Sequence, residues 1–360
     1  MNASNGSHRE GGHTLTNDQY TVGWIAALPH EAVAAKAALD RFHGRTPLTK
    51  NAADQNLYIL GRIGDHNVVI ASLPGGVIGL TLAATAAMHM LASFPSIRIC
   101  LMVGIGAGIP KVKRDRKTNK HRDLRDIRLG DVVISQPGGT HGGVHQYDLG
   151  KALIVGVFRP SGFLNGPPRA LLNAVGVLRQ LHEAGESDMP NYLVQILQSL
   201  ARARPSYAYP GQEYDRLFDA AYPHLEDEET CDDCSEDPEV TRLERPSTDP
   251  VLHCGVIASG NQVIKDPAVR DLLGSDCICF EMEAAGLMND FPCLVIRGIC
   301  DYADSHKNDG WQRYAAAAAA ACAKEVLQVM PKVEVEGERL AREVSWAMQM
   351  GAFEPPPYRS

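Results

Sequence analysis

The 360-residue sequence has no apolar run of the ~20 residues that a membrane-spanning helix needs. Its first 20 residues are polar and lack the apolar stretch of a secretory signal peptide. Positive charge is not in excess either, since 35 Lys and Arg stand against 43 Asp and Glu, whereas a general binder of polyanions is normally basic. We therefore expect neither a membrane protein nor a nucleic-acid-binding protein.

The even set of cysteines typical of a disulfide-stapled domain is also missing. There are nine cysteines, and four of them (Cys100, Cys279, Cys293 and Cys300) fall within apolar, strand-like segments. Thiols that serve as small core residues are typical of a reducing compartment, so we expect a cytoplasmic location. With 44% hydrophobic and 22% charged residues, the composition is that of a globular protein.

Strand-like apolar segments alternate with helical ones along most of the chain. The predicted strands are 20–28, 57–63, 67–73, 97–103, 131–135, 251–258, 277–280 and 293–299. The predicted helices are 31–39, 80–93, 169–183, 192–202, 283–288 and 311–329. Buried strands that alternate with helices favour a three-layer α/β/α sandwich around a mixed, largely parallel central sheet.

The pattern predicts one domain over residues 20–332, with a disordered lead at 1–19 and a tail or helix at 333–360. Two segments look like insertions into this domain. Residues 113–128 carry eight Lys or Arg against three Asp, and we expect an exposed, mobile loop there. Residues 159–250 are less regular and contain an acidic stretch.

Polar side chains gather in the segment CFEMEAAGLMNDFPCLVIRGICDYAD. Glu281 and Glu283 directly follow a strand, at the position where open α/β sheets bind ligands. Arg297 lies in the next apolar strand, where its burial demands a nearby carboxylate, and Asp301 ends that strand. Each acidic residue alone has a structural explanation, in a first helical turn or in a turn cap. Together they mark a candidate site.

Two other segments carry weaker signals. The first strand ends at His30 and Glu31, in the first turn of a predicted helix. The sequence Gly104–Gly108 closes a buried strand with GIGAG, which is similar to a phosphate-binding loop. The full GxGxxG spacing near the first strand is absent, and so we exclude a dinucleotide site.

In this order, the motifs resemble the purine nucleoside phosphorylase and methylthioadenosine nucleosidase superfamily. The resemblance runs from residue 20 to about residue 330. The stretches SGNQVIKD, FEMEAAGLM and RGICDYADSHKN are similar to nucleoside phosphorylase-type domains common in fungal proteins. The resemblance implies the nucleoside phosphorylase fold and the cleavage of a purine N-glycosidic bond without a metal or other cofactor.

The resemblance also implies roles for individual residues. Asp301 would donate a proton toward purine N7, which requires a raised pKa, and Glu31 would activate water. Glu283 would accept hydrogen bonds from the ribose 2′ and 3′ hydroxyls, and Met282 would pack against the sugar. The other substrate-binding residues that we expect are Glu281, Arg297, Val263, Ile264, Gly104 and Ile105. Arg297 would orient Glu31, while Glu281 would lie near the sugar or support Arg297.

The choice between water and phosphate as nucleophile depends on cations. Phosphorylases of the family hold phosphate with arginines and with a Ser or Thr in the glycine-rich turn. Here the first loop contains no arginine, and Met102 and Ile105 occupy the other two places. A dianion without a paired cation is strongly disfavoured, so we expect a purine nucleosidase acting on adenosine, inosine or guanosine. A phosphorylase, a nucleotide-cleaving enzyme whose 113–128 segment covers the 5′ end, and a nucleotide sensor stay open as alternatives.

Several finer properties stay undecided at this stage. The base could be read by Asn261, Gln262, Asp304 or Arg313, and the 5′ end could face His141, His145 or Tyr147. Members of the family often complete the site from a neighbouring subunit, so we expect a homodimer or a larger homo-oligomer.

A metal site is not assigned from the sequence. Cys231 and Cys234 form one CxxC, which is half of a zinc site, and His224 and His253 do not follow at a familiar spacing. An exposed acidic loop is the expectation there.

Overall fold

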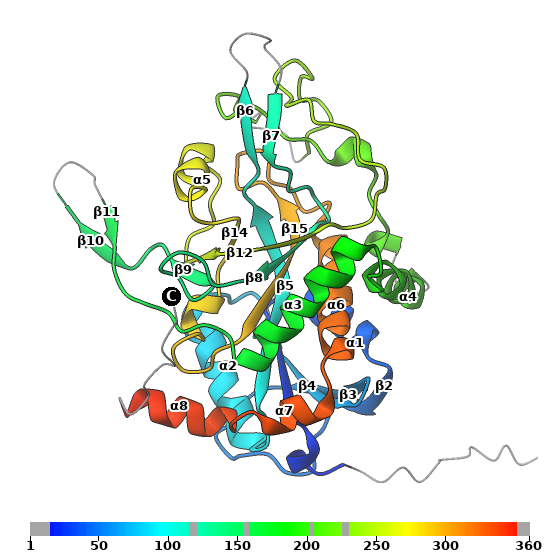
Figure 1. Ribbon diagram of the computed structural model, residues 1–360, viewed down its shortest axis with the longest axis vertical. Helices are drawn as coiled ribbons and strands as arrows, with labels where there is room; N and C mark the ends of the chain where they lie inside the picture. The colour runs from blue at the N-terminus through cyan, green and yellow to red at the C-terminus, as the bar shows by residue number, and fades with distance from the viewer. Residues whose placement is uncertain (1–14, 115–120, 154–157, 202–204, 225–229, 351–360) are drawn as a thin grey trace, which may run out of the picture.

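The computed structural model describes residues 15–114, 121–153, 158–201, 205–224 and 230–350 (Figure 1). Its centre is a mixed sheet of 11 strands within these ranges. Along the main path the strands are β12 (Leu252–Gly255), β8 (Val132–Ser135), β15 (Leu294–Asp301), β5 (Ile99–Gly108), β1 (Val22–Ala26), β4 (His66–Ser72), β3 (Tyr58–Ile63) and β2 (Arg41–Gly44). The short strands β9 (Val144–Gln146), β13 (Ile257–Ser259) and β14 (Cys279–Glu281) extend the sheet from the end of β5.

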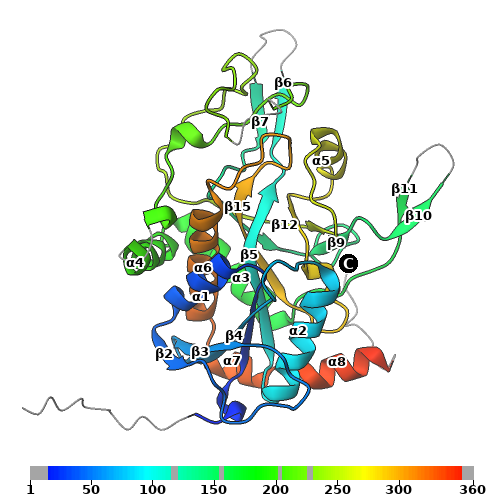
Figure 2. The same cartoon turned by 180° about the vertical axis from the view of Figure 1, so that it is seen from behind.

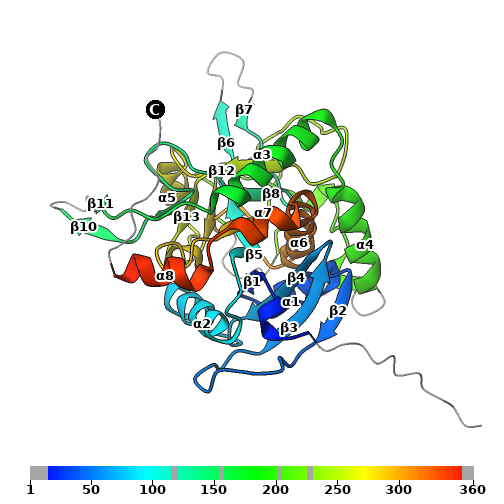
Figure 3. The ribbon, with the colours of Figure 1, turned by 60° about the horizontal axis from the view of Figure 1, so that its bottom comes forward.

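Helices cover both faces of the sheet, which confirms the predicted three-layer α/β/α sandwich. One face carries α1 (Pro29–Ala38), α3 (Arg169–Ala184), α4 (Met189–Ala201) and α6 (Gln312–Val329). The other carries α2 (Leu80–Ser93) and α8 (Ala341–Gln349). Figure 3 shows α2 and α8 on one side of the strands and α4 and α6 on the other. The remaining helices are α5 (Pro267–Leu273) and α7 (Lys332–Gly337).

Side-chain alternation along the central strands builds two cores. On β1, Trp24 packs into the core beneath α6 and Ile25 into the core beneath α2. On β5, Leu101 and Met102 divide in the same way. Because β1, β5 and β15 run parallel, their carboxyl ends reach the same edge of the sheet, which is where ligands bind in open α/β folds.

Helix α6 lies unusually close to the sheet. Its alanine run, 315–321, is buried throughout, with no member more than 2% exposed. A Cβ atom added to Gly298 of β15 would lie 1.9 Å from the backbone oxygen of Ala315. Small residues on both sides therefore allow the backbone of the helix to rest on the backbone of the strand.

Several local expectations are wrong. The glycines at 104–108 continue β5 and do not form a loop, and the helix expected at 283–288 is one 3-10 turn, Ala284–Gly286. The single strand expected at 251–258 is divided into β12 and β13. The lead expected to be disordered contains a 3-10 turn at Asn17–Gln19, where the Asn17 side chain donates to the backbone oxygens of Thr49 and Ser93.

The structure describes parts of both segments expected to be insertions, and the helices expected at 169–183 and 192–202 are present as α3 and α4. The basic segment forms a hairpin of β6 (Lys111–Arg114) and β7 (His121–Arg125), which stands out from the molecule beside the green loops (Figure 2), while residues 115–120 lie outside the described ranges. In the second segment, α3 and α4 supply Leu178, Leu193 and other side chains to the main core, so this part is integral to the fold. Among the described helices, none has the length and apolar character of a membrane-spanning segment.

Candidate active site

Glu31 is fixed at the start of α1, directly beyond β1. Pro29 begins the helix, and the Glu31 carboxylate folds back to accept the backbone amides of Ala27 (2.7 Å) and Leu28 (2.9 Å) on Oε2. Its Oε1 accepts the amide of Ile105 (2.8 Å) from β5. Burial raises the pKa of Glu31, while Arg297 and these amides oppose the rise. Three backbone amides thus fix the position of the carboxylate.

Gly104 makes room for this arrangement. A Cβ atom at this position would lie 2.3 Å from Oε1 of Glu31 and 2.5 Å from Nη1 of Arg297. Gly104 is therefore required at the site because it has no side chain. Any other residue there would displace the two charged groups.

Arg297 is the buried cation of the site. It has no solvent exposure, and its Nη2 forms ion pairs with Glu281 and, at 3.5 Å, with Glu283. Glu281 also accepts the backbone amides of Glu283 and Ala284. Glu281 therefore pairs with Arg297, the second of the two alternatives considered from the sequence. That Arg297 orients Glu31 stays a prediction: backbone amides hold that carboxylate, and Arg297 acts on it through its charge.

Glu283 is the carboxylate of this group that is least well compensated. Burial raises its pKa to about 7, and Glu281 and Glu31 add to the rise while Arg297 opposes it. Its position beside Arg297 and at the cavity wall suits a group that accepts hydrogen bonds from hydroxyls.

Asp301 ends β15 and forms an ion pair that sequence reasoning missed. Its Oδ2 accepts Lys307 Nζ at 2.8 Å, and its Oδ1 accepts the amide of Ala303, which has a positive φ of 55°. Burial alone would lower the pKa of Lys307, but Asp301, with Cys300 and Asp309, raises it. Where a lone acid was expected, the structure has a carboxylate and an ammonium group side by side.

One cavity of about 230 Å³ brings most of the predicted residues together. The predicted residues that line it are Glu31, Ile105, Val263, Ile264, Glu281, Met282, Glu283 and Asp301. Gly104 and Arg297 lie behind this wall, in contact with its carboxylates. Lining residues that were not predicted as contacts include Ile78, Phe280, Lys307 and Gln312; Gln262, a candidate base reader, is also present.

Other candidate contacts lie elsewhere. His141 and His145 stack on each other and line a separate cavity of about 270 Å³. Tyr147 lies closer, because its hydroxyl donates to the Gln262 backbone oxygen and its ring packs edge-on against Phe280. Burial lowers the pKa of His30 to about 4, which makes this side chain a neutral imidazole at neutral pH.

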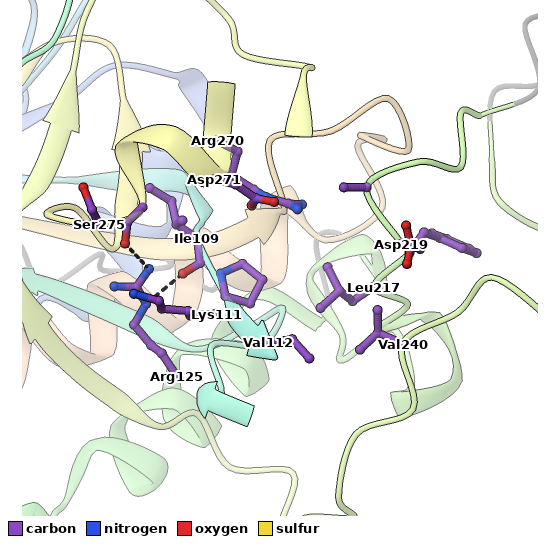
Figure 4. A pocket seen from close by; sticks show the side chains of 14 residues that line it. Ile109, Lys111, Val112, Arg125, Leu217, Asp219, Val240, Arg270, Asp271 and Ser275 are labelled. Atoms are coloured by element: carbon purple, nitrogen blue, oxygen red, sulfur yellow. Dashed lines mark hydrogen bonds and ion pairs between the residues drawn. The ribbon is translucent and has the colours of Figure 1, made fainter. Parts of the chain in front are cut away.

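A larger cavity of about 380 Å³ lies at the base of the β6–β7 hairpin. The described residues of the hairpin line this cavity and do not line the 230 Å³ cavity that contains Glu31. Figure 4 shows Arg125 in its wall, with the guanidinium donating to the backbone oxygens of Ile109 and Gly274. Arg270 is also engaged, by Asp271 and Asp304. These cations hold loops together, and the described part of the hairpin does not cover a 5′ end.

The fold is that of the nucleoside phosphorylases and nucleosidases. Futalosine hydrolase of Helicobacter pylori strain 26695 matches with a TM-score of 0.50 and 16% identity, over 86% of this chain and 97% of that one. The 5′-methylthioadenosine/S-adenosylhomocysteine nucleosidase of Neisseria meningitidis, in complex with methylthio-immucillin-A, matches with a TM-score of 0.51 and 15% identity, over 86% and 98%. The fold implied by the sequence motifs is confirmed.

Sequence relatives are longer proteins. A nucleotide-binding leucine-rich repeat (NLR)-like protein of Hyaloscypha variabilis is 43% identical over 334 residues, which are 91% of this chain and 31% of that protein. ATP nucleosidase Cap17 of Escherichia coli is 37% identical over 87 residues, 22% of this chain and 17% of that protein. The chain thus spans less than a third of the length of these curated relatives, and no known protein-family profile matches it.

Proposed function

We propose that this chain is a purine nucleoside N-ribohydrolase, which cleaves adenosine, inosine or guanosine with water to give free base and ribose. One observation carries the proposal: Glu31, Glu283 and Asp301 line a single cavity whose wall offers no unpaired cation among the described residues. Lys307 is the one cationic side chain in that wall, and Asp301 neutralises it.

Glu31 is the proposed general base. A carboxylate offers about four acceptor positions, and three of them take the amides of Ala27, Leu28 and Ile105. The fourth is free for a water molecule, which Glu31 would deprotonate as it attacks the anomeric carbon. The raised pKa of Glu31 favours this proton transfer.

The other two carboxylates have different tasks. Glu283 would accept the ribose hydroxyls, and Met282 would pack against the sugar ring. Asp301 with Lys307 would face the purine, where negative charge develops as the glycosidic bond breaks. The ammonium group of Lys307 would stabilise this charge, and a proton passed from Lys307 through Asp301 to N7 would let the base leave neutral.

The same electrostatics argues against a phosphorylase. Phosphate would need a cation that reaches the cavity, whereas Arg297 is fully buried behind the wall and its Nη2 is paired with Glu281 and Glu283. The four carboxylates that line the cavity, Glu31, Glu281, Glu283 and Asp301, would repel a dianion.

Product analysis on inosine, guanosine and adenosine, with and without phosphate, tests the proposal. We expect free base and ribose at a rate indifferent to phosphate, and loss of turnover in Glu31→Gln. Glu334→Gln, on the exposed surface of α7, is the matched control and should retain full activity. Ribose 1-phosphate as the product would refute hydrolysis.

A second candidate, cleavage of a nucleoside triphosphate, is favoured by the local similarity to ATP nucleosidase Cap17. Adenine release from ATP and from adenosine should be compared at equal concentration. A preference for ATP would replace the nucleoside by the nucleotide as substrate and keep the roles of Glu31 and Glu283.

We also propose a homo-oligomer in the cytoplasm. Val77, Ile78 and Val263 are 43–51% exposed, and two of them line the active-site cavity, so a second subunit is well placed to cover them. All nine cysteines are unpaired, as in a reducing compartment. Light scattering after size-exclusion chromatography tests the oligomer.

A further inference from the structure

Three potential metal ligands converge outside the active-site cavity. His224, Cys231 and Cys234 each place a ligand atom so that all three atoms lie within 4.8 Å of one another. Two ligands bound at about 2.3 Å to a tetrahedral zinc ion lie about 3.8 Å apart, so a small contraction would close the site. Two thiols and an imidazole are the donor set that zinc prefers over harder cations. His253, the other histidine considered from sequence, instead contacts Asp131.

The CxxC segment already has the form of a turn that presents both sulfur atoms. The amide of Cys234 donates to the backbone oxygen of Cys231 at 3.1 Å. Arg216 donates to the backbone oxygens of Cys231 (2.6 Å) and Cys234 (3.1 Å) and so fixes the turn from behind. Asn308 Nδ2 reaches the Cys231 sulfur at 4.0 Å, as a donor that would stabilise a thiolate.

His224 is held in the orientation of a metal ligand. Its Nε2 lies 2.9 Å from the backbone oxygen of Thr230, and since a carbonyl oxygen only accepts, Nε2 carries the proton. The lone pair is therefore on Nδ1. Histidine ligands of zinc characteristically donate the second ring N–H to a carbonyl or carboxylate in this way.

His306 supplies an independent observation. His306 is only 7% exposed, yet neither of its ring nitrogens has a hydrogen-bond partner among the described residues. An unsatisfied buried polar group costs about 1–3 kcal/mol, so it calls for a partner that is still to be identified. The ring lies edge-on to His224, with 5.3 Å between ring centroids, and its Nδ1 is 3.7 Å from Asp304. A small shift would let Nδ1–H donate to Asp304, which would leave the Nε2 lone pair for a metal.

We propose that His224, Cys231 and Cys234 bind one zinc ion, and that His306, which lies outside this group of three, moves toward them to complete a closed, structural site. The first three residues lie in the segment that follows α4, and His306 lies in the loop that follows β15. That loop also carries Lys307, which pairs with Asp301 of the active-site cavity. The zinc ion would tie the two segments together and thereby hold the Asp301–Lys307 pair in place.

The test is the metal content of the full chain. The protein is purified without chelator, dialysed, and measured by inductively coupled plasma mass spectrometry; we expect about one zinc ion per chain. Cys234→Ser should reduce this content at least tenfold. Cys254→Ser is the matched control, because Cys254 is a partly buried cysteine on β12 outside the cluster and should keep its zinc.

Cobalt replacement keeps the test decisive if the Cys234 variant does not fold. Wild-type protein stripped of metal and loaded with Co²⁺ should show thiolate-to-cobalt charge-transfer absorption and the intense visible bands of tetrahedral cobalt. His306→Ala should weaken these visible bands while the charge-transfer absorption persists. Wild-type protein without stoichiometric zinc, and without cobalt charge transfer after loading, would overturn the proposal.

Discussion

Replacing Arg297 with methionine tests whether one buried cation holds the carboxylates of the site together. Arg297 is fully buried and is paired with two buried glutamates, Glu281 and Glu283. Removal of one partner from a buried ion pair costs about 3–5 kcal/mol, because the remaining charge is left without compensation. The Nε and Nη1 donors of Arg297 lack hydrogen-bond partners among the described residues, so their loss offsets part of this cost. We expect a loss of about 3 kcal/mol in the free energy of unfolding near pH 8.

The loss should depend on pH with a definite sign. Without the cation, which opposes the rise, the pKa of Glu283 in the folded protein is raised further above that in the unfolded chain. The folded state then binds more protons than the unfolded state at intermediate pH, so the variant becomes less stable as pH increases. The difference between variant and wild type should therefore be smaller near pH 5 than near pH 8.

Urea unfolding followed by tryptophan fluorescence measures both quantities. Arg62→Met is the control, since Arg62 forms an exposed ion pair with Asp65 and its loss should cost less than about 1 kcal/mol. Adding Glu281→Gln to Arg297→Met should recover part of the stability. A loss below about 1 kcal/mol, or one that is equal at both pH values, would refute the reasoning about the buried cation.

The remaining predictions concern the catalytic groups. Glu31→Gln should lower kcat by about 10²–10⁴, measured by base release; near-normal turnover would remove Glu31 from the mechanism. Because the glutamine amide cannot accept all three backbone amides, the free energy of unfolding in urea titrations should also fall, by about 1–3 kcal/mol. Asp301→Asn should retain substrate binding by calorimetry and lose most turnover, less so for substrates whose leaving group needs no protonation. Lys307→Met should reduce kcat more than it changes KM, because its charge is needed as the base departs; unchanged kcat would contradict this role. Because the pKa of Glu283 is raised to about 7 from an ordinary 4.5, wild-type stability should fall as pH rises between these values, and Glu283→Gln should flatten that slope in urea titrations at stepped pH.

The central sheet and most of the cavity wall could be predicted from the sequence because they depend on local patterns. A strand followed by Pro29 places Glu31 in the first turn of a helix, and β15 places Asp301 at its carboxyl end. Apolar runs of strand length are enough to predict both positions without any tertiary contact.

Features that depend on chain reversal could not be predicted in this way. Lys307 reaches Asp301 through a turn in which Ala303 adopts a positive φ, and no hydrophobic period marks such a turn. An aspartate at a strand end followed within a turn by lysine is the signal that could have been used. The glycines at 104–108 were misassigned to a loop because glycine usually marks turns, whereas here they continue β5: the charged groups of Glu31 and Arg297 require Gly104, and close packing requires Gly106 and Gly108.

The contact between α6 and β15 has a consequence for sequence variation. In a saturation-mutagenesis library, positions 315–321 and Gly298 should accept little beyond glycine, alanine and serine, although none of them touches the active-site cavity. A larger side chain there would push the helix away from the strand that carries Arg297 and Asp301, and the loss would be scored as a loss of activity. The scan would show low tolerance to substitution in a segment whose alanine-rich composition is typical of many helices. The positions of low tolerance would map the interface between α6 and the sheet.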